Sequence, residues 1–215
     1  MLRFLVGLFA LTLASFSVAA PEKWAGAIDQ FTAADAKNPP LRNGIVFVGS
    51  SSIRMWTTLE KDFPGLPLIN RGFGGSELGD SVAFADRIVT AYQPRTVVVY
   101  AGENDINAGK SPESVHAHFN AFRTKVHAAL PQARIIFIAL KPSPSRWKLK
   151  ANMIRANELI AAECRQDKRL TFLDIWPDML DAKGEPRPEL FLKDMLHMKP
   201  EGYAIWTARL APELK

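Results

Sequence analysis

The sequence contains a single cysteine, Cys164, among its 215 residues. One thiol cannot form an intramolecular disulfide, so the hydrophobic core must hold the fold. Cys164 lies in a helical pattern, and we interpret it as a small buried apolar side chain rather than as a catalytic thiol. Internal repeats, low-complexity segments and long linkers are also missing. We therefore expect one compact domain.

Long tracts of one charge are missing too. The 27 Lys and Arg residues are interspersed with 22 Asp and Glu residues, which gives a formal net charge of +5 without a basic stretch. This distribution argues against a nucleic-acid partner. Metal ligands are not clustered: His116 and His118 lie two residues apart in a helical stretch and so face different sides, and no Cys or carboxylate group completes a site. We expect no metal and no cofactor.

The one long apolar run is at the amino terminus. Arg3 precedes an apolar stretch from Phe4 to Phe16, and small residues follow it up to Ala20. This pattern is typical of a cleaved signal peptide, and the run is shorter than the roughly 20 apolar residues of a membrane-spanning helix. We predict a signal peptide at residues 1–20 and an exported domain at residues 21–215, periplasmic or secreted, without stable membrane insertion after cleavage. An uncleaved signal anchor is the alternative.

The rest of the chain alternates between two patterns. Short apolar runs have the composition of strands covered on both faces, and segments with helical periodicity separate them. The expected strands are 44–49, 67–70, 96–102, 134–140 and 170–175, and the expected helices lie near 22–31 and over 77–92, 112–130, 151–166 and 200–214. This order predicts an α/β fold, a three-layer α/β/α sandwich around a five-stranded parallel sheet. In such sheets ligands bind outside the carboxyl ends of the strands.

Three consecutive serines, Ser50, Ser51 and Ser52, follow Gly49 at the end of the first strand. Serine is a favoured N-cap residue, but one helix cap accounts for only one of the three. A serine at this turn can alternatively be a nucleophile. The α/β-hydrolase elbow Gly-x-Ser-x-Gly is excluded, because Ile53 stands at the position of its last glycine.

A glycine-rich turn, residues 70–79, follows the second strand. Gly72 and Gly74 match the first two glycines of a dinucleotide-binding fingerprint. The third position is Glu77, however, and no acidic residue stands at a strand end about 20 residues further on. Backbone amides of such a turn can instead bind an oxyanion.

Polar residues also follow the third and fifth strands. Asn104 is either a turn residue or a side-chain amide donor for the same oxyanion. Asp194 and His197 precede the last helix, three residues apart, a spacing that lets the carboxylate orient the imidazole and support its protonated form. A nucleophile, a base, a carboxylate and oxyanion donors are the parts that acyl transfer requires.

These segments resemble the SGNH hydrolases, also called GDSL-type esterases and lipases. The matching blocks are Gly49–Ser51, Asn70–Gly75, Gly102–Asp105 and Asp194–His197, which stand in the family's order. The resemblance implies a flavodoxin-like SGNH hydrolase fold with strand order 2-1-3-4-5. It also implies a Ser51 nucleophile, a His197 base and an Asp194 partner. The implied oxyanion donors are the backbone N–H groups of Ser51 and Gly75 and the side chain of Asn104.

The first block departs from the family pattern. Ser50 replaces the usual aspartate and Ser52 the usual leucine, while Ser51 keeps the position of the nucleophile. Neither replaced position carries the chemistry of the family, but Ser50 and Ser52 stay open as substitute nucleophiles.

We therefore predict an exported serine esterase that hydrolyses carboxylic esters through an acyl-enzyme. Short acyl esters of a small molecule, glycan or lipid are the first choice of substrate, because no long helical lid of the kind that suits a long-chain lipase is present. The segment 141–150, which carries cations and Trp147, is expected at the same rim. Two alternatives are an acyltransferase that uses the same acyl-enzyme and a non-catalytic carbohydrate-binding module on this fold.

Overall fold

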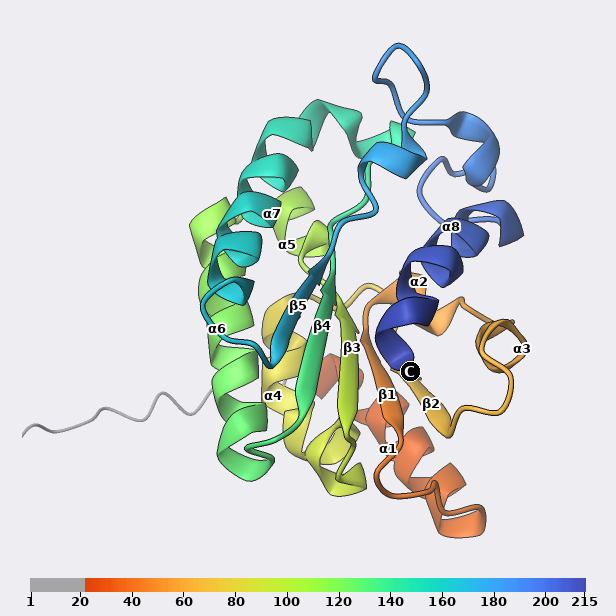
Figure 1. The fold of residues 1–215 in the computed structure, drawn as a ribbon, viewed down its shortest axis with the longest axis vertical. Coiled ribbons are helices and arrows are strands. Elements are labelled where there is room, and N and C mark those ends of the chain that lie inside the picture. Colours follow the sequence, from red (N-terminus) through yellow and green to blue (C-terminus); the bar gives the residue numbers. More distant parts are fainter. Residues whose placement is uncertain (1–21) are drawn as a thin grey trace, which may run out of the picture.

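The computed structural model describes residues 22–215, so the predicted signal peptide lies outside the described residues. One five-stranded parallel sheet runs through the molecule with strand order β2-β1-β3-β4-β5 (Figure 1). Its strands are β1 (Ile45–Gly49), β2 (Leu68–Gly72), β3 (Thr96–Tyr100), β4 (Arg134–Ile138) and β5 (Leu170–Leu173). The sheet confirms the predicted α/β class and the strand order that the family resemblance implied.

The strands point alternate side chains into two hydrophobic cores, which explains why their sequences are apolar throughout. On β1, Val46 and Val48 belong to the core on one face of the sheet, and Ile45 and Phe47 belong to the core on the other. All four side chains are almost fully buried. Burial of an aliphatic or aromatic side chain of this kind contributes about 1.5–3 kcal/mol to the free energy of folding, so the central strands stabilise the fold strongly.

Helices cover both faces of the sheet and complete the three layers (Figure 1). One face packs against α1 (Glu22–Lys37), α4 (Leu78–Ile88), α6 (Pro112–Ala129) and α7 (Lys150–Cys164). The other packs against α2 (Ser51–Arg54), α3 (Leu59–Asp62) and α8 (Pro200–Leu210). The expected helices are all present. The short helix α5 (Glu103–Asn107) stands where only a turn after β3 was considered.

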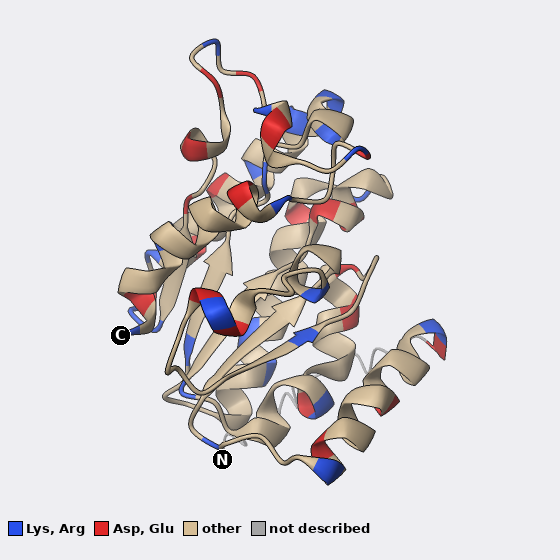
Figure 2. Cartoon of the chain, turned by 90° about the vertical axis from the view of Figure 1, so that its right-hand side faces the viewer, with Lys and Arg blue, Asp and Glu red and all other residues tan. Residues whose placement is uncertain are grey.

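The remaining features of the chain agree with its composition. Cys164 is buried at the end of α7, as expected, and burial raises the pKa of its thiol to about 12. Figure 2 shows the Lys and Arg residues interspersed with Asp and Glu residues over the elements in view, without a continuous stripe of one sign. Between residues 22 and 215, no helix has both the length and the apolar content that a bilayer crossing requires.

Candidate active site

The first strand ends in a tight turn that leads directly to Ser51. Gly49 has a φ of +138°, and a Cβ atom at this position would lie 2.0 Å from the carbonyl oxygen of Tyr100 on β3. The N–H of Ser50 donates a hydrogen bond to the same oxygen at 3.0 Å. Only glycine lets the two strand ends approach this closely, and helix α2 begins at the next residue but one, Ser51.

The three consecutive serines have different surroundings. Ser50 and Ser52 are buried, whereas Ser51 is partly exposed. Ser50 stands at the N-cap position of α2, but its hydroxyl makes no capping hydrogen bond. The hydroxyl of Ser52 accepts a hydrogen bond from Lys141 Nζ at 3.3 Å. Ser51 Oγ lies 3.0 Å from His197 Nε2, so this serine, and not its neighbours, is the one bonded to the imidazole.

A short loop before α8 brings Asp194 and His197 into contact. Asp194 Oδ2 lies 2.6 Å from His197 Nδ1, and Asp194 Oδ1 accepts hydrogen bonds from the N–H groups of Leu196 and His197, both at 3.0 Å. The N–H of Leu192 donates to the carbonyl of His197 at 2.7 Å and closes the loop. The imidazole therefore has Nδ1 toward the carboxylate and Nε2 toward Ser51.

The carboxyl group of Asp194 stays ionised over a wide range of pH. Burial acts to raise its pKa, but hydrogen bonds from the imidazole of His197 and from two backbone N–H groups outweigh burial and lower the pKa to about 2. A carboxylate at Nδ1 favours the tautomer that is protonated there and stabilises the imidazolium that forms when Nε2 accepts a proton. The side chains of Asp194 and His197 are 47% and 23% exposed, so the pair lies at an open surface.

The predicted oxyanion donors Gly75 and Asn104 come from turns that are hydrogen-bonded to each other. Asn104 Nδ2 donates to the carbonyl oxygen of Ser76 at 2.9 Å, one residue beyond Gly75. Gly75 has a φ of +77°, which glycine adopts without strain. Within residues 22–215, we find no hydrogen bond from the backbone N–H of Ser51 or Gly75 to another protein group. Neither N–H group is therefore engaged by another described residue.

The glycine turn is packed between two other elements. A Cβ atom at Gly75 would lie 3.4 Å from Cη2 of Trp24, whose Nε1 donates to Asp80 Oδ2 at 2.9 Å. A Cβ atom at Gly74 would lie 2.6 Å from Nε of Arg54. Trp24 belongs to α1 and Arg54 to α2, and neither residue is part of a sequence motif. No local pattern relates them to the turn, because they reach it only in the folded chain.

A buried group of charges lies next to the site, and no sequence pattern indicated it. Glu103 and Lys141 form an ion pair in which the side chains are only 4% and 1% exposed. The carboxylate also accepts hydrogen bonds from Tyr100 Oη at 2.7 Å and from Ser143 Oγ at 3.1 Å. Burial acts to raise the pKa of Glu103, but the cations Lys141 and Arg146 lower it overall. Only their position in the sequence could have indicated the pair, because Glu103 follows β3 and Lys141 follows β4 at the carboxyl edge of the sheet.

The segment 141–150 lies beside the loop that carries Asp194 and His197, in agreement with the expected rim. The N–H of Ser145 donates to the carbonyl of Met195 at 3.0 Å, between the two predicted catalytic residues of that loop. Trp147 stacks on Trp176 with a centroid distance of 6.0 Å and an interplanar angle of 28°. Arg146 turns inward, so the basic residues of the segment do not all face solvent.

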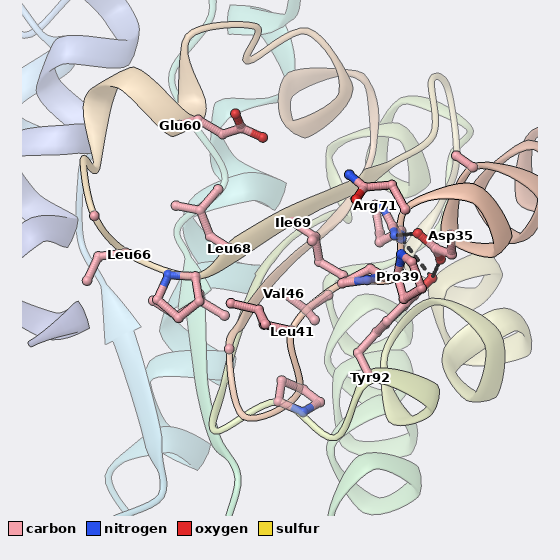
Figure 3. A pocket seen from close by; sticks show the side chains of 18 residues that line it. Asp35, Pro39, Leu41, Val46, Glu60, Leu66, Leu68, Ile69, Arg71 and Tyr92 are labelled. Atoms are coloured by element: carbon pink, nitrogen blue, oxygen red, sulfur yellow. Dashed lines mark hydrogen bonds and ion pairs between the residues drawn. The ribbon is translucent and has the colours of Figure 1, made fainter.

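Three cavities lie apart from the five predicted site residues Ser51, Gly75, Asn104, Asp194 and His197. The one in Figure 3 has a volume of about 710 Å³ and lies between α1 and the strands β1 and β2, and its walls include Arg71, Asp35 and Tyr92. The other two measure about 400 and 430 Å³. None of the three, all formed by described residues, is lined by a predicted site residue. Across residues 22–215, no three His, Cys, Asp or Glu side chains are placed to hold a metal ion.

Solved structures define the class of protein to which this fold belongs. A candidate platelet activating factor from Streptococcus pneumonia matches with 17% identity and a TM-score of 0.80, covering 90% of this chain and 94% of that chain. A GDSL-like lipase from Bacteroides thetaiotaomicron matches with 19% identity and a TM-score of 0.73, covering 87% and 96%. A variant of an acetyl-xylooligosaccharide esterase from Geobacillus Stearmophilus matches with 14% identity and a TM-score of 0.64, covering 81% and 95%. The fold is that of the GDSL, or SGNH, hydrolases.

The sequence then assigns the family. The model of the GDSL-like lipase/acylhydrolase family matches residues 47–205, and the chain belongs to this family. No curated protein matches the chain. Family membership confirms the resemblance found in the four sequence blocks and supports an ester hydrolase in general terms.

Proposed function

We propose that the protein is an exported serine esterase with Ser51 as its nucleophile. The observation that carries the proposal is the continuous hydrogen-bonded chain from Ser51 through His197 to Asp194, with distances of 3.0 and 2.6 Å. A hydroxyl, an imidazole and a carboxylate in this order are the arrangement that activates a serine for attack on an acyl group.

The proposed reaction proceeds through an acyl-enzyme. His197 Nε2 takes the proton from Ser51 Oγ as that oxygen forms a bond to the ester carbonyl carbon. The tetrahedral intermediate collapses, the bond to the alcohol oxygen breaks, and the imidazolium returns its proton to the leaving alcohol. Water then attacks the acyl-enzyme by the same steps, which release the acid and regenerate the serine.

The negative charge that develops on the carbonyl oxygen needs donors that are already in place. The proposed donors are the backbone N–H groups of Ser51 and Gly75 and the side chain of Asn104. The Asn104 amide carries two hydrogens, and the bond to Ser76 uses one of them. The other remains for the oxyanion.

Esters with short acyl groups are the substrates that this open site favours. The side chains of Asp194 and His197 are 47% and 23% exposed, so the pair opens to solvent, as suits a small ester. The structural neighbour named as an acetyl-xylooligosaccharide esterase is consistent with this choice.

Turnover of p-nitrophenyl esters of increasing chain length tests the substrate class. We expect kcat/KM to be highest for acetate or propionate and to fall with longer chains, because the partly exposed Asp194–His197 pair lies at an open surface. An optimum at eight carbons or more would contradict the proposal. Added polyols and product analysis separate the alternatives: transfer of the acyl group would identify an acyltransferase, and absence of turnover would favour a non-catalytic binding module.

Labelling with a fluorophosphonate tests the nucleophile. We expect peptide mapping to find the label on Ser51, and Ser51→Ala to abolish both labelling and turnover while cooperative unfolding is retained. Ser50→Ala and Ser52→Ala are matched controls within the same turn and should still be labelled. A label on Ser50 or Ser52 in the wild type would overturn the assignment.

Export is a further part of the proposal, and it depends on residues 1–20. Expression of the full chain with a carboxy-terminal tag in a bacterial host should give a mature protein that begins at residue 20 or 21, outside the cytoplasm. A chain that retains residues 1–20 and stays in the membrane would indicate the uncleaved anchor instead.

A further inference from the structure

The side-chain amide of Asn104 is held at both ends. Its Oδ1 accepts a hydrogen bond from a terminal guanidinium nitrogen of Arg146 at 2.9 Å, and its Nδ2 donates to the carbonyl oxygen of Ser76 at 2.9 Å. A guanidinium has only donors and a carbonyl oxygen is only an acceptor. Rotation of the amide by 180° would therefore place donor against donor and acceptor against acceptor. The two partners admit one orientation of the amide.

Arg146 is itself held in place by the buried cluster. Its side chain is only 12% exposed, and its second terminal nitrogen lies 3.8 Å from Glu103 Oε1. The same carboxylate pairs with Lys141 and accepts from Ser143. Glu103 therefore pairs with the guanidinium of Arg146. The same guanidinium donates to the side chain of Asn104, the residue that follows Glu103 in the chain. Arg146 is not a free surface cation.

The segment that carries Arg146 also contacts the catalytic loop. Arg146 lies in the 3₁₀ turn η2 (Pro144–Leu149), and the N–H of the preceding residue, Ser145, donates to the carbonyl of Met195 at 3.0 Å. One short segment therefore touches both the proposed oxyanion donor and the loop between Asp194 and His197.

We propose that Arg146 is a positioning residue that orients the Asn104 amide as an oxyanion donor and polarises it. This inference rests on the proposed esterase function. Arg146 lies outside the four sequence blocks that resemble the family. A cation at the carbonyl end of an amide strengthens hydrogen-bond donation from its nitrogen end, because linked hydrogen bonds polarise one another. A donor whose direction is set before the reaction costs no reorganisation when the negative charge develops.

A double-mutant cycle with Asn104→Ala tests this role. Arg146→Met keeps an apolar stem but removes all donors, and we expect it to lower kcat about 10- to 100-fold with KM little changed. The loss should stay below that of Asn104→Ala, since it acts through the same amide. In the Asn104→Ala background, Arg146→Met should change kcat less than about twofold, because coupled residues are not additive. Arg146→Lys, which keeps the charge and some donors, should recover part of the loss.

Lys148→Met is the matched control, since Lys148 is an exposed cation in the same turn, and it should leave kcat unchanged. Thermal unfolding of each variant shows whether the fold is retained. Equal losses from Arg146→Met with and without Asn104 would overturn the inference, because they would show an effect that does not pass through the amide. Wild-type activity of Arg146→Met would overturn it as well. Either result leaves the esterase proposal intact, whereas an inactive wild type with an unlabelled Ser51 would end both.

Discussion

The molecule contains two groups of buried or half-buried charged side chains. Both pair a carboxylate with a guanidinium, but only one of them donates a hydrogen bond to a candidate site residue. On the edge strand β2, Arg71 pairs with Asp35 and donates from Nε to Tyr92 Oη at 2.8 Å (Figure 3). Its guanidinium also lies against the rings of Phe31 and Tyr92. Behind the candidate site, Glu103 gathers Lys141 and Arg146. Each group uses a carboxylate to hold a guanidinium that is mostly withdrawn from water.

The two groups differ in the acceptors that their guanidinium groups bind. The hydrogen bonds of Arg71 end within its own group and the adjoining backbone, so that group joins α1 to the sheet. Arg146 sends one hydrogen bond out of its group to Asn104. We therefore expect the Arg71 group to act on stability and the Glu103 group to act on the proposed reaction as well. Variants of the site and of the Glu103 group should change kcat, and variants of the Arg71 group should change the free energy of unfolding.

After the loss of the nucleophile in Ser51→Ala, the largest effect is expected for Asp194→Asn, which lies outside both groups. The amide cannot support an imidazolium at Nδ1 and favours the wrong tautomer, so kcat should fall about 10⁴-fold, with the fold unchanged. Stopped assays on p-nitrophenyl acetate with active-site titration measure the loss. A fall of less than tenfold would show that His197 does not depend on this carboxylate.

Asn104→Ala is expected to lower kcat about 10²- to 10³-fold, the loss typical of one oxyanion donor. KM should change little, because the donor acts mainly on the charge that develops in the transition state. Asn38→Ala, at an exposed position in the loop after α1, is the control. If instead KM rises and kcat is retained, Asn104 positions the substrate and does not bind the oxyanion.

Arg71→Met should act on stability alone. Removal of one partner from a largely buried ion pair costs about 3 kcal/mol. The carboxylate of Asp35 loses its cation and keeps only the hydrogen bond from Tyr92 Oη at 2.6 Å, and the hydroxyl of Tyr92 loses the donor Nε of Arg71. Urea unfolding should show this loss, while kcat per folded molecule should equal that of the wild type. A lower kcat at unchanged stability would mean that the two groups of charges do not divide as proposed.

The smallest effect concerns pH. The folded pKa of Asp194 is lowered to about 2, below an unfolded value of about 3.9, so its hydrogen bonds contribute stability that is complete only above about pH 5. That contribution is lost as the pH falls through 2. Because the side chain is 47% exposed, we expect less than about 1 kcal/mol. The urea midpoints of wild type and Asp194→Asn should converge between pH 5 and pH 2, and a constant difference would contradict the assignment.

The catalytic pH dependence has a different origin. His197 accepts the proton of Ser51 only in its neutral form, so kcat/KM for p-nitrophenyl acetate should rise as the pH rises from 5. Asp194 remains charged over this range and does not contribute to the rise. A flat profile with chemistry rate-limiting would count against His197 as the base.

Much of the fold could be predicted because its signals are local. Apolar runs such as 96–102 are strands because both of their faces are buried, and the helical periodicity at 112–130 corresponds to a single helix, α6. The short helix α5 was not foreseen, since its five residues are polar except for Ile106 and carry no periodicity. The order of the strands came from the resemblance to the family and not from periodicity.

The candidate site could be predicted only where its chemistry is local as well. Asp194 and His197 lie three residues apart, and Gly49 stands next to the serines, so sequence patterns pointed to them. Arg146 looked like one more surface cation in a basic segment, and Glu103 looked like part of a turn. Arg146 contacts Asn104, and Glu103 contacts Lys141. The two residues of each pair lie far apart in the sequence, so no local pattern predicts these contacts.

The sequence by itself determined the α/β class, the positions of the strands and the residue types that a serine esterase requires, because these follow from burial, periodicity and short-range hydrogen bonding. The tertiary structure alone decided that Ser51 Oγ lies 3.0 Å from His197 Nε2, and that Asn104 has one permitted orientation. Both outcomes depend on the close approach of loops from different strands. Parallel strands bring their carboxyl ends to one edge, and only there do these distant side chains meet.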